Sequence, residues 1–222
     1  MSRAQVSLKV YRTSLLYNKD IFRIEYMMNV VSIDIGYHNM GIVSAFIDDE
    51  YEITVKDVYK INLTCIRHHK VQPHECKIPH TNEVVDLFAH FIQEYGHILE
   101  NADKILVERQ PPTGLTNIEA LILYQYRQKT HLISPNAMHS HFMIGHLDYE
   151  RRKVKTIEIA EKFLESFEKY QSLSRKHDIS DAMCMILFDN HYKKEKYRLS
   201  KVDRTLPFEK FKYDPVHNNR VR

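Results

Sequence analysis

Cysteine is scarce in this sequence, which has only Cys65, Cys76 and Cys184 among its 222 residues. So few cysteines, and an odd number of them, argue against the disulfide framework of a small secreted domain and indicate a reducing compartment. Long apolar runs are lacking too, because no segment approaches the roughly 18 to 20 residues that a membrane-spanning helix needs. The sequence therefore predicts a soluble intracellular protein that does not enter a membrane and whose stability comes from core packing.

Internal repeats and low-complexity tracts are also missing, and glycine and proline number only five and seven. With 43% hydrophobic residues, the chain is too apolar to be disordered throughout, and its length suits one compact domain. The net charge of +3 is mild. A polyanionic partner must therefore be argued from where the charges lie.

The first 27 residues have no uninterrupted apolar stretch, which excludes an ordinary secretory signal. Four basic residues precede the first acid, Asp20, so a mitochondrial transit peptide stays open. We favour an upstream extension, with Met27 or Met28 as the functional start. The expected organisation is an extension over 1–27, a folded core over 28–192 and a basic tail over 193–222.

Hydrophobic periodicity predicts the elements of the core. Two β-branched runs suggest a hairpin, and further strands and helices then alternate along the chain. The expected strands are 30–35, 41–47, 53–63, 104–108 and 131–134, and the expected helices are 84–99, 118–125, 154–167 and 179–191. This order predicts a single α/β domain in which helices flank a mixed five-stranded sheet.

Four acidic residues stand at strand ends or at a helix start. Asp34 interrupts an apolar strand, Glu108 ends another, and Asp178 and Asp181 open the last helix. Asp178 and Asp181 suit helix capping, and Glu108 suits a surface ion pair with Arg109, but a buried Asp34 is costly without a partner. If the four meet at one sheet edge, their repulsion calls for divalent cations, and oxygen ligands favour Mg²⁺ or Mn²⁺ over zinc. Two-metal phosphodiester cleavage needs such a site.

Three segments resemble a known family. SIDIGYHNMG (32–41), LVERQ (106–110) and DISDAMCMILF (178–188) are similar to the acidic motifs of RuvC-type Holliday junction resolvases, which have the ribonuclease H-like fold. The likeness is strongest to the resolvases of poxviruses and other large DNA viruses, and extends to those of fungal mitochondria. It implies a Mg²⁺-dependent endonuclease, with Mn²⁺ as a substitute, that cuts four-way and related branched DNA.

The same resemblance implies roles for individual residues. Asp34, Glu108, Asp178 and Asp181 would be the metal ligands. The family often has a lysine before the last acid pair, for which Lys155 is the candidate and Lys153 the second choice. A viral source would place the protein at the replication site of the host cell or in the virion, with mitochondria as the alternative.

Basic residues are concentrated late in the chain. Segment 151–176 has eight Lys or Arg against four Glu, and segment 193–222 has ten basic residues against four acids. Such patches attract phosphate backbones without reading sequence. We therefore expect DNA contacts from Arg109, Arg151, Arg152, Lys153 and Lys176. The tail aromatics, among them Tyr192 and Tyr197, suit base stacking and docking on the domain equally.

Paired cuts across a four-way junction also predict a homodimer, since a two-fold dimer presents one site to each strand. The apolar stripes over 84–99 and 118–122 are candidate dimer surfaces, although such stripes are more often core.

The segment from Cys65 to Cys76, CIRHHKVQPHEC, could supply zinc ligands. The candidates are Cys65, His68 or His69, His74 and Cys76, with His80 just beyond them. The alternative is a polar loop with incidental histidines, which the irregular spacing favours.

Three other functions stay open. A ribonuclease H that acts on RNA–DNA hybrids would need the same carboxylates. A non-catalytic DNA-binding domain would have lost its metals, which four retained acids argue against. An actin-like or sugar-kinase-like ATPase would use the glycine after Asp34 for phosphate, but needs a second lobe that the chain is too short to supply.

Overall fold

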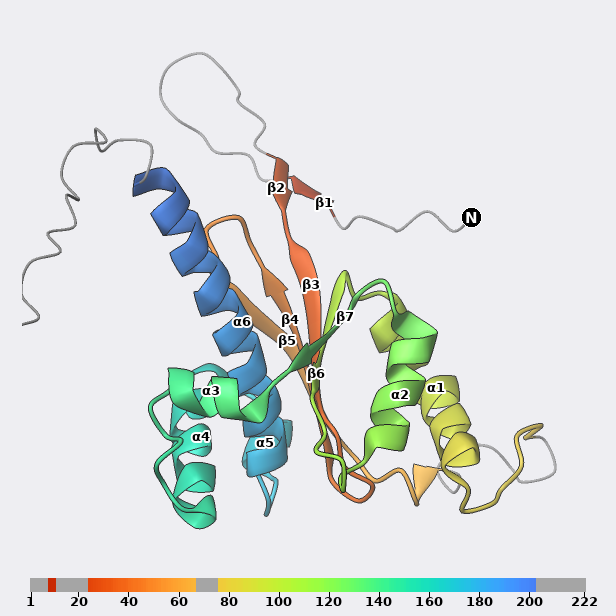
Figure 1. The fold of residues 1–222 in the computed structure, drawn as a ribbon. Helices are drawn as coiled ribbons and strands as arrows, with labels where there is room; N and C mark the ends of the chain where they lie inside the picture. The colour runs from red at the N-terminus through yellow and green to blue at the C-terminus, as the bar shows by residue number, and fades with distance from the viewer. Residues whose placement is uncertain (1–7, 11–23, 67–75, 203–222) are drawn as a thin grey trace, which may run out of the picture.

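In the computed structural model, which describes residues 8–10, 24–66 and 76–202, a five-stranded mixed sheet lies between two groups of helices (Figure 1). The strands, in spatial order, are β5 (Ile53–Ile61), β4 (Met40–Ile47), β3 (Met28–Asp34), β6 (Lys104–Glu108) and β7 (Thr130–Ile133). The β3–β4 and β4–β5 pairs are antiparallel, and the β3–β6 and β6–β7 pairs are parallel. The predicted fold class is therefore confirmed.

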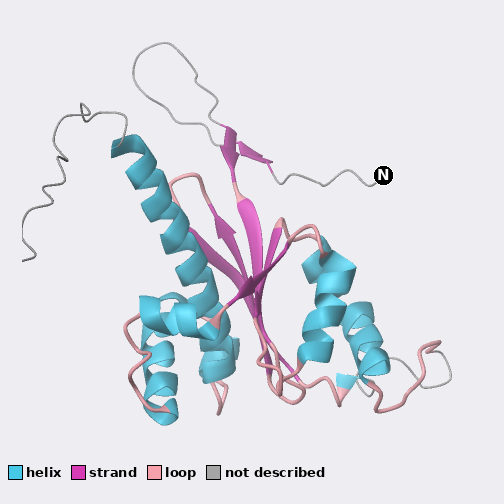
Figure 2. Cartoon of the chain, viewed as in Figure 1, coloured by secondary structure: helices cyan, strands magenta, loops and turns pink. Residues whose placement is uncertain are grey.

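Successive side chains of β3 and β6 point to opposite faces of the sheet, and so the core has two halves. Val31, Ile33, Ile105 and Val107 face α1 (Val84–Glu100) and α2 (Thr116–Tyr126). Val30 and Leu106 face the other way, toward α4 (Tyr149–Leu164) and α6 (His177–Val202). The two helical layers lie on opposite sides of the sheet in Figure 2. Asp34 and Glu108 occur at the even-numbered positions that point toward α6.

The apolar stripes of α1 and α2 are part of the core. Their buried members pack against the sheet, and include Leu87, Phe88, Phe91, Leu99, Ile118 and Ile122. The idea that these stripes form a dimer surface is therefore wrong, since the sheet already covers them.

Two of the predicted helices, those expected over 154–167 and 179–191, have different bounds in the structure. The helix expected over 154–167 begins at Tyr149, because the Asp148 side chain accepts a hydrogen bond from Arg151 N at 2.9 Å and caps it. The helix expected over 179–191 runs from His177 to Val202, so it crosses the boundary expected at 192. Its last turns are rich in Lys and Arg without an apolar stripe, and such a sequence carries no helical periodicity.

Several short elements were not predicted from the sequence. They are α3 (Pro135–His141), α5 (Glu168–Gln171) and an antiparallel pair, β1 (Leu8–Val10) with β2 (Ile24–Tyr26), within the expected extension. Pro135 had suggested only a strand end, yet it occupies the first turn of α3, where its missing N–H costs nothing.

Two polar contacts fix α6 along the sheet. At the far end from the acids, Lys104 Nζ lies 2.5 Å from Asp189 Oδ1, and Asn190 Nδ2 donates to Tyr51 O at 2.7 Å. Both Lys104 and Asn190 are buried, so these contacts hold the helix against the strands at one register. No helix among the described residues is long and apolar enough to cross a membrane.

Candidate active site

Asp34 and Glu108 lie side by side at the ends of β3 and β6. Ile33 is in register with Val107, so the next residues of these parallel strands are Asp34 and Glu108. The start of α6 brings Asp181 to the same place. These three carboxylates line one small cavity with Ile133, Pro135, Met138 and Met185. Three of the four acids picked out from the sequence thus meet in space.

Burial raises the pKa values of all three carboxyl groups, and repulsion from neighbouring acids adds to it at Asp34 and Asp181. Burial is the main cause that raises the pKa of Asp34 well above its usual 3.8, and the charges of Glu108 and Asp181 add to it. Burial also raises the pKa of Glu108, against the opposing effect of hydrogen bonds with Asp34 and Gln110. The pKa of Asp181 rises to about 7, chiefly through burial, although a hydrogen bond from Thr156 lowers it. The cavity therefore concentrates negative charge that lacks a counter-charge within it.

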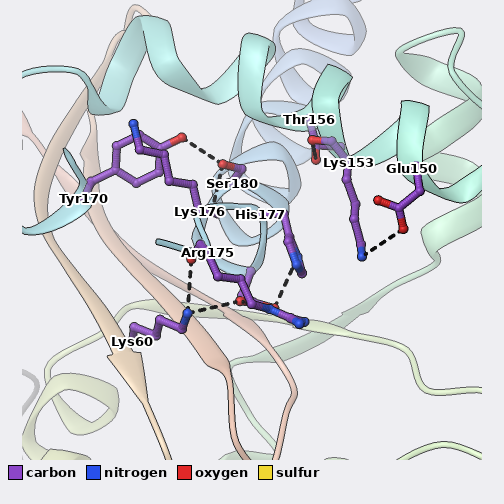
Figure 3. Close-up of polar contacts among 10 residues, drawn as sticks. Lys60, Glu150, Lys153, Thr156, Tyr170, Arg175, Lys176, His177 and Ser180 are labelled. Atoms are coloured by element: carbon purple, nitrogen blue, oxygen red, sulfur yellow. Dashed lines mark hydrogen bonds and ion pairs between the residues drawn. The ribbon is translucent and has the colours of Figure 1, made fainter. Parts of the chain in front are cut away.

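Asp178 is placed differently from the other three. Its buried carboxylate accepts two hydrogen bonds from Arg175, from Nε at 2.9 Å and from the guanidinium Nη2 at 3.0 Å. Lys60 Nζ lies 3.8 Å away and His177 Nδ1 3.3 Å away, and Figure 3 shows these basic groups around the start of α6. Asp178 is thus neutralised by cations, and lies in the second position of α6 instead of capping it.

Gly41 lets α6 come this close to the strands. Gly41 pairs with Asp34 across the β3–β4 hairpin. A Cβ atom at Gly41 would lie only 2.2 Å from Asp178 O and 2.4 Å from its carbonyl carbon. Because the obstacle is backbone, any side chain at position 41 must push the start of α6, and with it Asp181, away from Asp34.

Residues 28–189 match the model of a family described as the poxvirus A22 protein. The chain belongs to the poxvirus A22 protein family. The match covers the whole sheet and reaches far into α6, so it contains all four acids. The poxvirus resemblance seen in the sequence is confirmed. A search of curated proteins found no match.

Solved structures share the fold of this A22-family chain. The fowlpox virus resolvase bound to Holliday junction DNA is 16% identical, with a TM-score of 0.53, and the match covers 75% of this chain and 99% of the resolvase. The yeast mitochondrial Holliday junction resolvase is 17% identical, with a TM-score of 0.56, and the match covers 81% and 86%. At such low identity the likeness shows the ribonuclease H-like fold, as expected from the motifs.

The structure separates the two candidate lysines of α4. Lys155 is exposed and forms an ion pair with Glu158 one turn away. The charge of Lys153, by contrast, lowers the pKa of Asp181, so Lys153 is the lysine that acts on the acidic cavity. The structure therefore does not bring Lys155 to the carboxylates. Helical phase held the signal, because Lys153 precedes the buried Thr156 by three residues and the buried Ala160 by seven, so it shares their face of α4, whereas Lys155 does not.

Gln110 is a site residue that sequence reasoning missed. Its Nε2 donates to Glu108 Oε2 at 2.9 Å, and its Oε1 accepts from Leu115 N at 3.2 Å. Its own backbone N–H donates to Glu119 Oε2 at 2.6 Å. Gln110 therefore fixes the Glu108 carboxylate relative to the start of α2.

The predicted DNA-contacting residues fall into two groups. Arg109 and Arg152 line one cleft with Gln110 and His139. Arg109 directly follows Glu108 in the sequence. Arg151 pairs with Asp148 at 3.4 Å on the surface, and Lys176 pairs with Glu161 at 3.6 Å. Lys153 pairs with Glu150 at 3.6 Å on α4, and its charge lowers the pKa of Asp181. Only the first group forms a basic cleft that opens beside the acidic cavity.

The donor set suits a divalent cation. All of the oxygens that line the cavity from charged side chains are carboxylate oxygens, which hard cations such as Mg²⁺ and Mn²⁺ prefer. A cation would also offset the cost of ionising these buried carboxyl groups, which raises their pKa values. The residues therefore fit a divalent metal on their chemistry alone.

The zinc ligands that the sequence could supply are only partly described. His68, His69 and His74 lie outside the described residues. Cys76 and His80 do approach each other, but their third partner is His90 of α1, which the sequence did not single out.

Proposed function

We propose that this A22-family protein is a divalent-metal-dependent endonuclease that resolves four-way DNA junctions. The observation that carries the proposal is the meeting of Asp34, Glu108 and Asp181 at one cavity, in a chain whose family match spans all three. The fold shared with the fowlpox virus resolvase, which was solved with Holliday junction DNA, supports the choice of substrate. Membership of a poxvirus family favours a viral protein over a mitochondrial one.

Asp34, Glu108 and Asp181 would hold Mg²⁺, with Mn²⁺ as a substitute, and Asp178 would join them from the edge of the site. When bound, such ions activate water and stabilise the leaving oxygen in phosphodiester hydrolysis. Gln110 keeps Glu108 oriented, and Thr156 does the same for Asp181. Burial excludes bulk water from these side chains and strengthens their hold on a cation.

Basic residues around the cavity would bind the DNA backbone. Arg109 and Arg152 line the cleft beside Glu108 and contact phosphates there. The charge of Lys153 reaches Asp181 and lowers its pKa, and there it would stabilise the negative charge that develops on the phosphate. Because Arg175 already neutralises Asp178, it also keeps the entrance to the site from repelling DNA.

Resolution of a four-way junction needs two symmetric cuts, so the active form would be a homodimer with one site on each chain. Sedimentation at micromolar concentration should give twice the mass of the 26.5 kDa chain. A purely monomeric protein that nicks single strands without coupling would contradict the dimer.

The decisive experiment is a cleavage panel of four-way junction, flap and RNA–DNA hybrid with Mg²⁺ or Mn²⁺. We expect paired cuts in the junction, and loss of at least about a thousandfold in rate for Asp34→Asn, since a metal ligand supplies several kcal/mol of transition-state stabilisation. Junction binding should persist or tighten, because the variant removes a negative charge near DNA. Asp57→Asn on β5, whose carboxylate pairs with Lys169, is the matched control.

The other outcomes separate the rival functions. Preferential cleavage of the hybrid would replace the proposal with a ribonuclease H. Binding to the junction without any cut, in either metal, would indicate a non-catalytic DNA-binding domain. Cleavage by Asp34→Asn at the wild-type rate would show that the active site lies elsewhere.

A further inference from the structure

A second cluster of metal-binding side chains lies on the other face of the sheet. Cys76 and His80 lie in the segment that leads into α1, and His90 lies in the second turn of that helix. The potential donor atoms of the three side chains lie within 4.8 Å of one another. The two histidine rings meet edge to face, with centroids 4.7 Å apart. Residues fourteen positions apart in sequence thus converge on one point.

The His90 ring is held in the orientation that a ligand needs. Its Nδ1 lies 2.9 Å from Asp86 O, one turn earlier in α1, and that carbonyl can only accept a hydrogen bond. The proton therefore resides on Nδ1, and Nε2 keeps its lone pair. Nε2 points at the Cys76 sulfur, 3.8 Å away. A backbone carbonyl that fixes the tautomer in this way is typical of metal-bound histidine.

The spacing of the atoms suits zinc. A tetrahedral Zn²⁺ ion with Zn–S near 2.3 Å and Zn–N near 2.05 Å places sulfur and nitrogen about 3.6 Å apart. The observed distance from Cys76 Sγ to His90 Nε2 is 3.8 Å, so the pair needs almost no rearrangement to hold an ion. His90 is 6% exposed, which shields the metal–ligand bond on the core side. Thiolate and imidazole together select zinc over the hard cations that the carboxylates attract.

We propose that Cys76, His80 and His90 bind one structural Zn²⁺ ion that ties the segment before α1 to the helix. Three protein ligands leave one position of the tetrahedron for a further ligand. The first residue before α1, Glu83, makes no side-chain cap, so the metal would add to the hydrogen bond from Thr81 to Asp86 in holding this helix end. The inference is independent of the proposed nuclease function, because none of its residues touches the acidic cavity.

The test is the zinc content of the full chain, produced without a polyhistidine tag and dialysed against metal-free buffer. Native mass spectrometry and elemental analysis should both give about one Zn²⁺ ion per chain. Cys76→Ser and His90→Ala should each weaken Zn²⁺ binding by at least about a hundredfold, because loss of a ligand costs more than loss of its supporting hydrogen bond.

Two substitutions serve as matched controls. Cys65→Ser removes a half-buried cysteine outside the cluster, and His97→Ala removes an exposed histidine of the same helix. Both should keep the full zinc content. Replacement of the metal by Co²⁺ should produce a thiolate charge-transfer band that survives Cys65→Ser and disappears in Cys76→Ser.

Thermal unfolding distinguishes a variant that has lost its zinc site from one that folds poorly. A zinc chelator should lower the Tm of the wild-type protein and leave the Tm of Cys76→Ser unchanged. A wild-type protein that neither retains zinc nor binds added Zn²⁺ would overturn the proposal, and so would equal zinc content in the wild type and in folded His90→Ala. In either case the cluster would be a hydrogen-bonded Cys–His–His contact only.

Discussion

The two polar clusters of this protein lie on opposite faces of one sheet and differ in how they tolerate the absence of a metal. On the α6 face, burial raises the pKa values of three carboxyl groups, neighbouring charges add to the effect at Asp34 and Asp181, and no cation lines their cavity. On the α1 face, Cys76 and His90 already hydrogen-bond, and His90 bonds the backbone. The buried carboxyl groups of the first cluster are costly to ionise without a cation. The side chains of the second cluster satisfy one another's hydrogen bonds without one.

That difference indicates different uses. A site of buried carboxylate oxygens binds an exchangeable ion, and the bound ion can stabilise the transition state of a reaction, as in many functional sites. A preorganised site of sulfur and nitrogen suits a permanent ion that supports the fold. The following experiments test this difference between the two sites.

The largest effect is expected from Glu108→Gln. The substitution keeps the shape of the side chain and its contact with Gln110, and removes only the charge that would bind metal. Junction cleavage should fall by at least about a thousandfold, as for loss of any metal ligand. Glu158→Gln, on the exposed face of α4, is the control and should cleave at the wild-type rate. Retained cleavage in Glu108→Gln would break the assignment of the oxygen site.

Lys153→Ala and Lys155→Ala form a matched pair on one helix. Lys153 acts on Asp181 and Lys155 does not, so we expect Lys153→Ala to lower kcat by about ten- to a hundredfold, in line with loss of one electrostatic contact in an active site. Lys155→Ala should change kcat by less than about twofold, as for an exposed ion pair. Single-turnover rates at saturating enzyme separate chemistry from binding. Equal losses in the two variants would assign both lysines to backbone binding.

Gly41→Ala tests how closely α6 must approach the strands. The added methyl group would lie 2.2 Å from Asp178 O, and such overpacking typically costs about 1 to 3 kcal/mol. In a domain of this size that cost lowers the Tm by roughly 2 to 10 °C. Gly145→Ala, whose methyl group would find its nearest neighbour at 3.9 Å, should leave the Tm within about 1 °C. Equal melting of both variants would refute the close approach.

The smallest effect concerns the pH dependence of the protein in a metal chelator. Because the folded-state pKa of Asp181 is raised from 3.8 to about 7, the folded state loses stability as the pH rises through this interval. Asp181→Asn should therefore match the wild-type Tm near pH 4 and exceed it near pH 8, by about 2 to 5 °C. Excess Mg²⁺ should stabilise the wild type at pH 8 and the variant much less. A Tm difference that does not change with pH would contradict the raised pKa of Asp181 in the folded protein.

Much of this arrangement could be predicted from sequence, because strand periodicity and the positions of Asp34 and Glu108 are local signals. The sequence does not contain the strand register that sets these two residues side by side. Nor does it reveal that Asp178 turns toward Arg175 and Lys60, since Lys60 comes from a distant strand. The helical periodicity of α4 could have identified Lys153 in place of Lys155.

The α1 cluster was harder to predict for a different reason. Cys76 and His80 stand in a visible Cys- and His-rich segment, whereas His90 lies in an amphipathic helix, where a lone histidine looks like any core neighbour. Only the path of the chain from 76 to 84 folds that segment back onto the helix. The same limit applies to the end of α6, whose charged turns carry no periodic signal but continue to Val202.

The most direct test of the contrast between the two sites is a crystal of the wild-type protein soaked in Mn²⁺, with anomalous diffraction recorded at the manganese and zinc edges. The account predicts manganese peaks about 2.0 to 2.4 Å from carboxylate oxygens of Asp34, Glu108 and Asp181, and a zinc peak at Cys76, His80 and His90. Absence of manganese between the three carboxylates, in crystals that cleave junction DNA when dissolved, would contradict the central claim that these residues form the catalytic metal site.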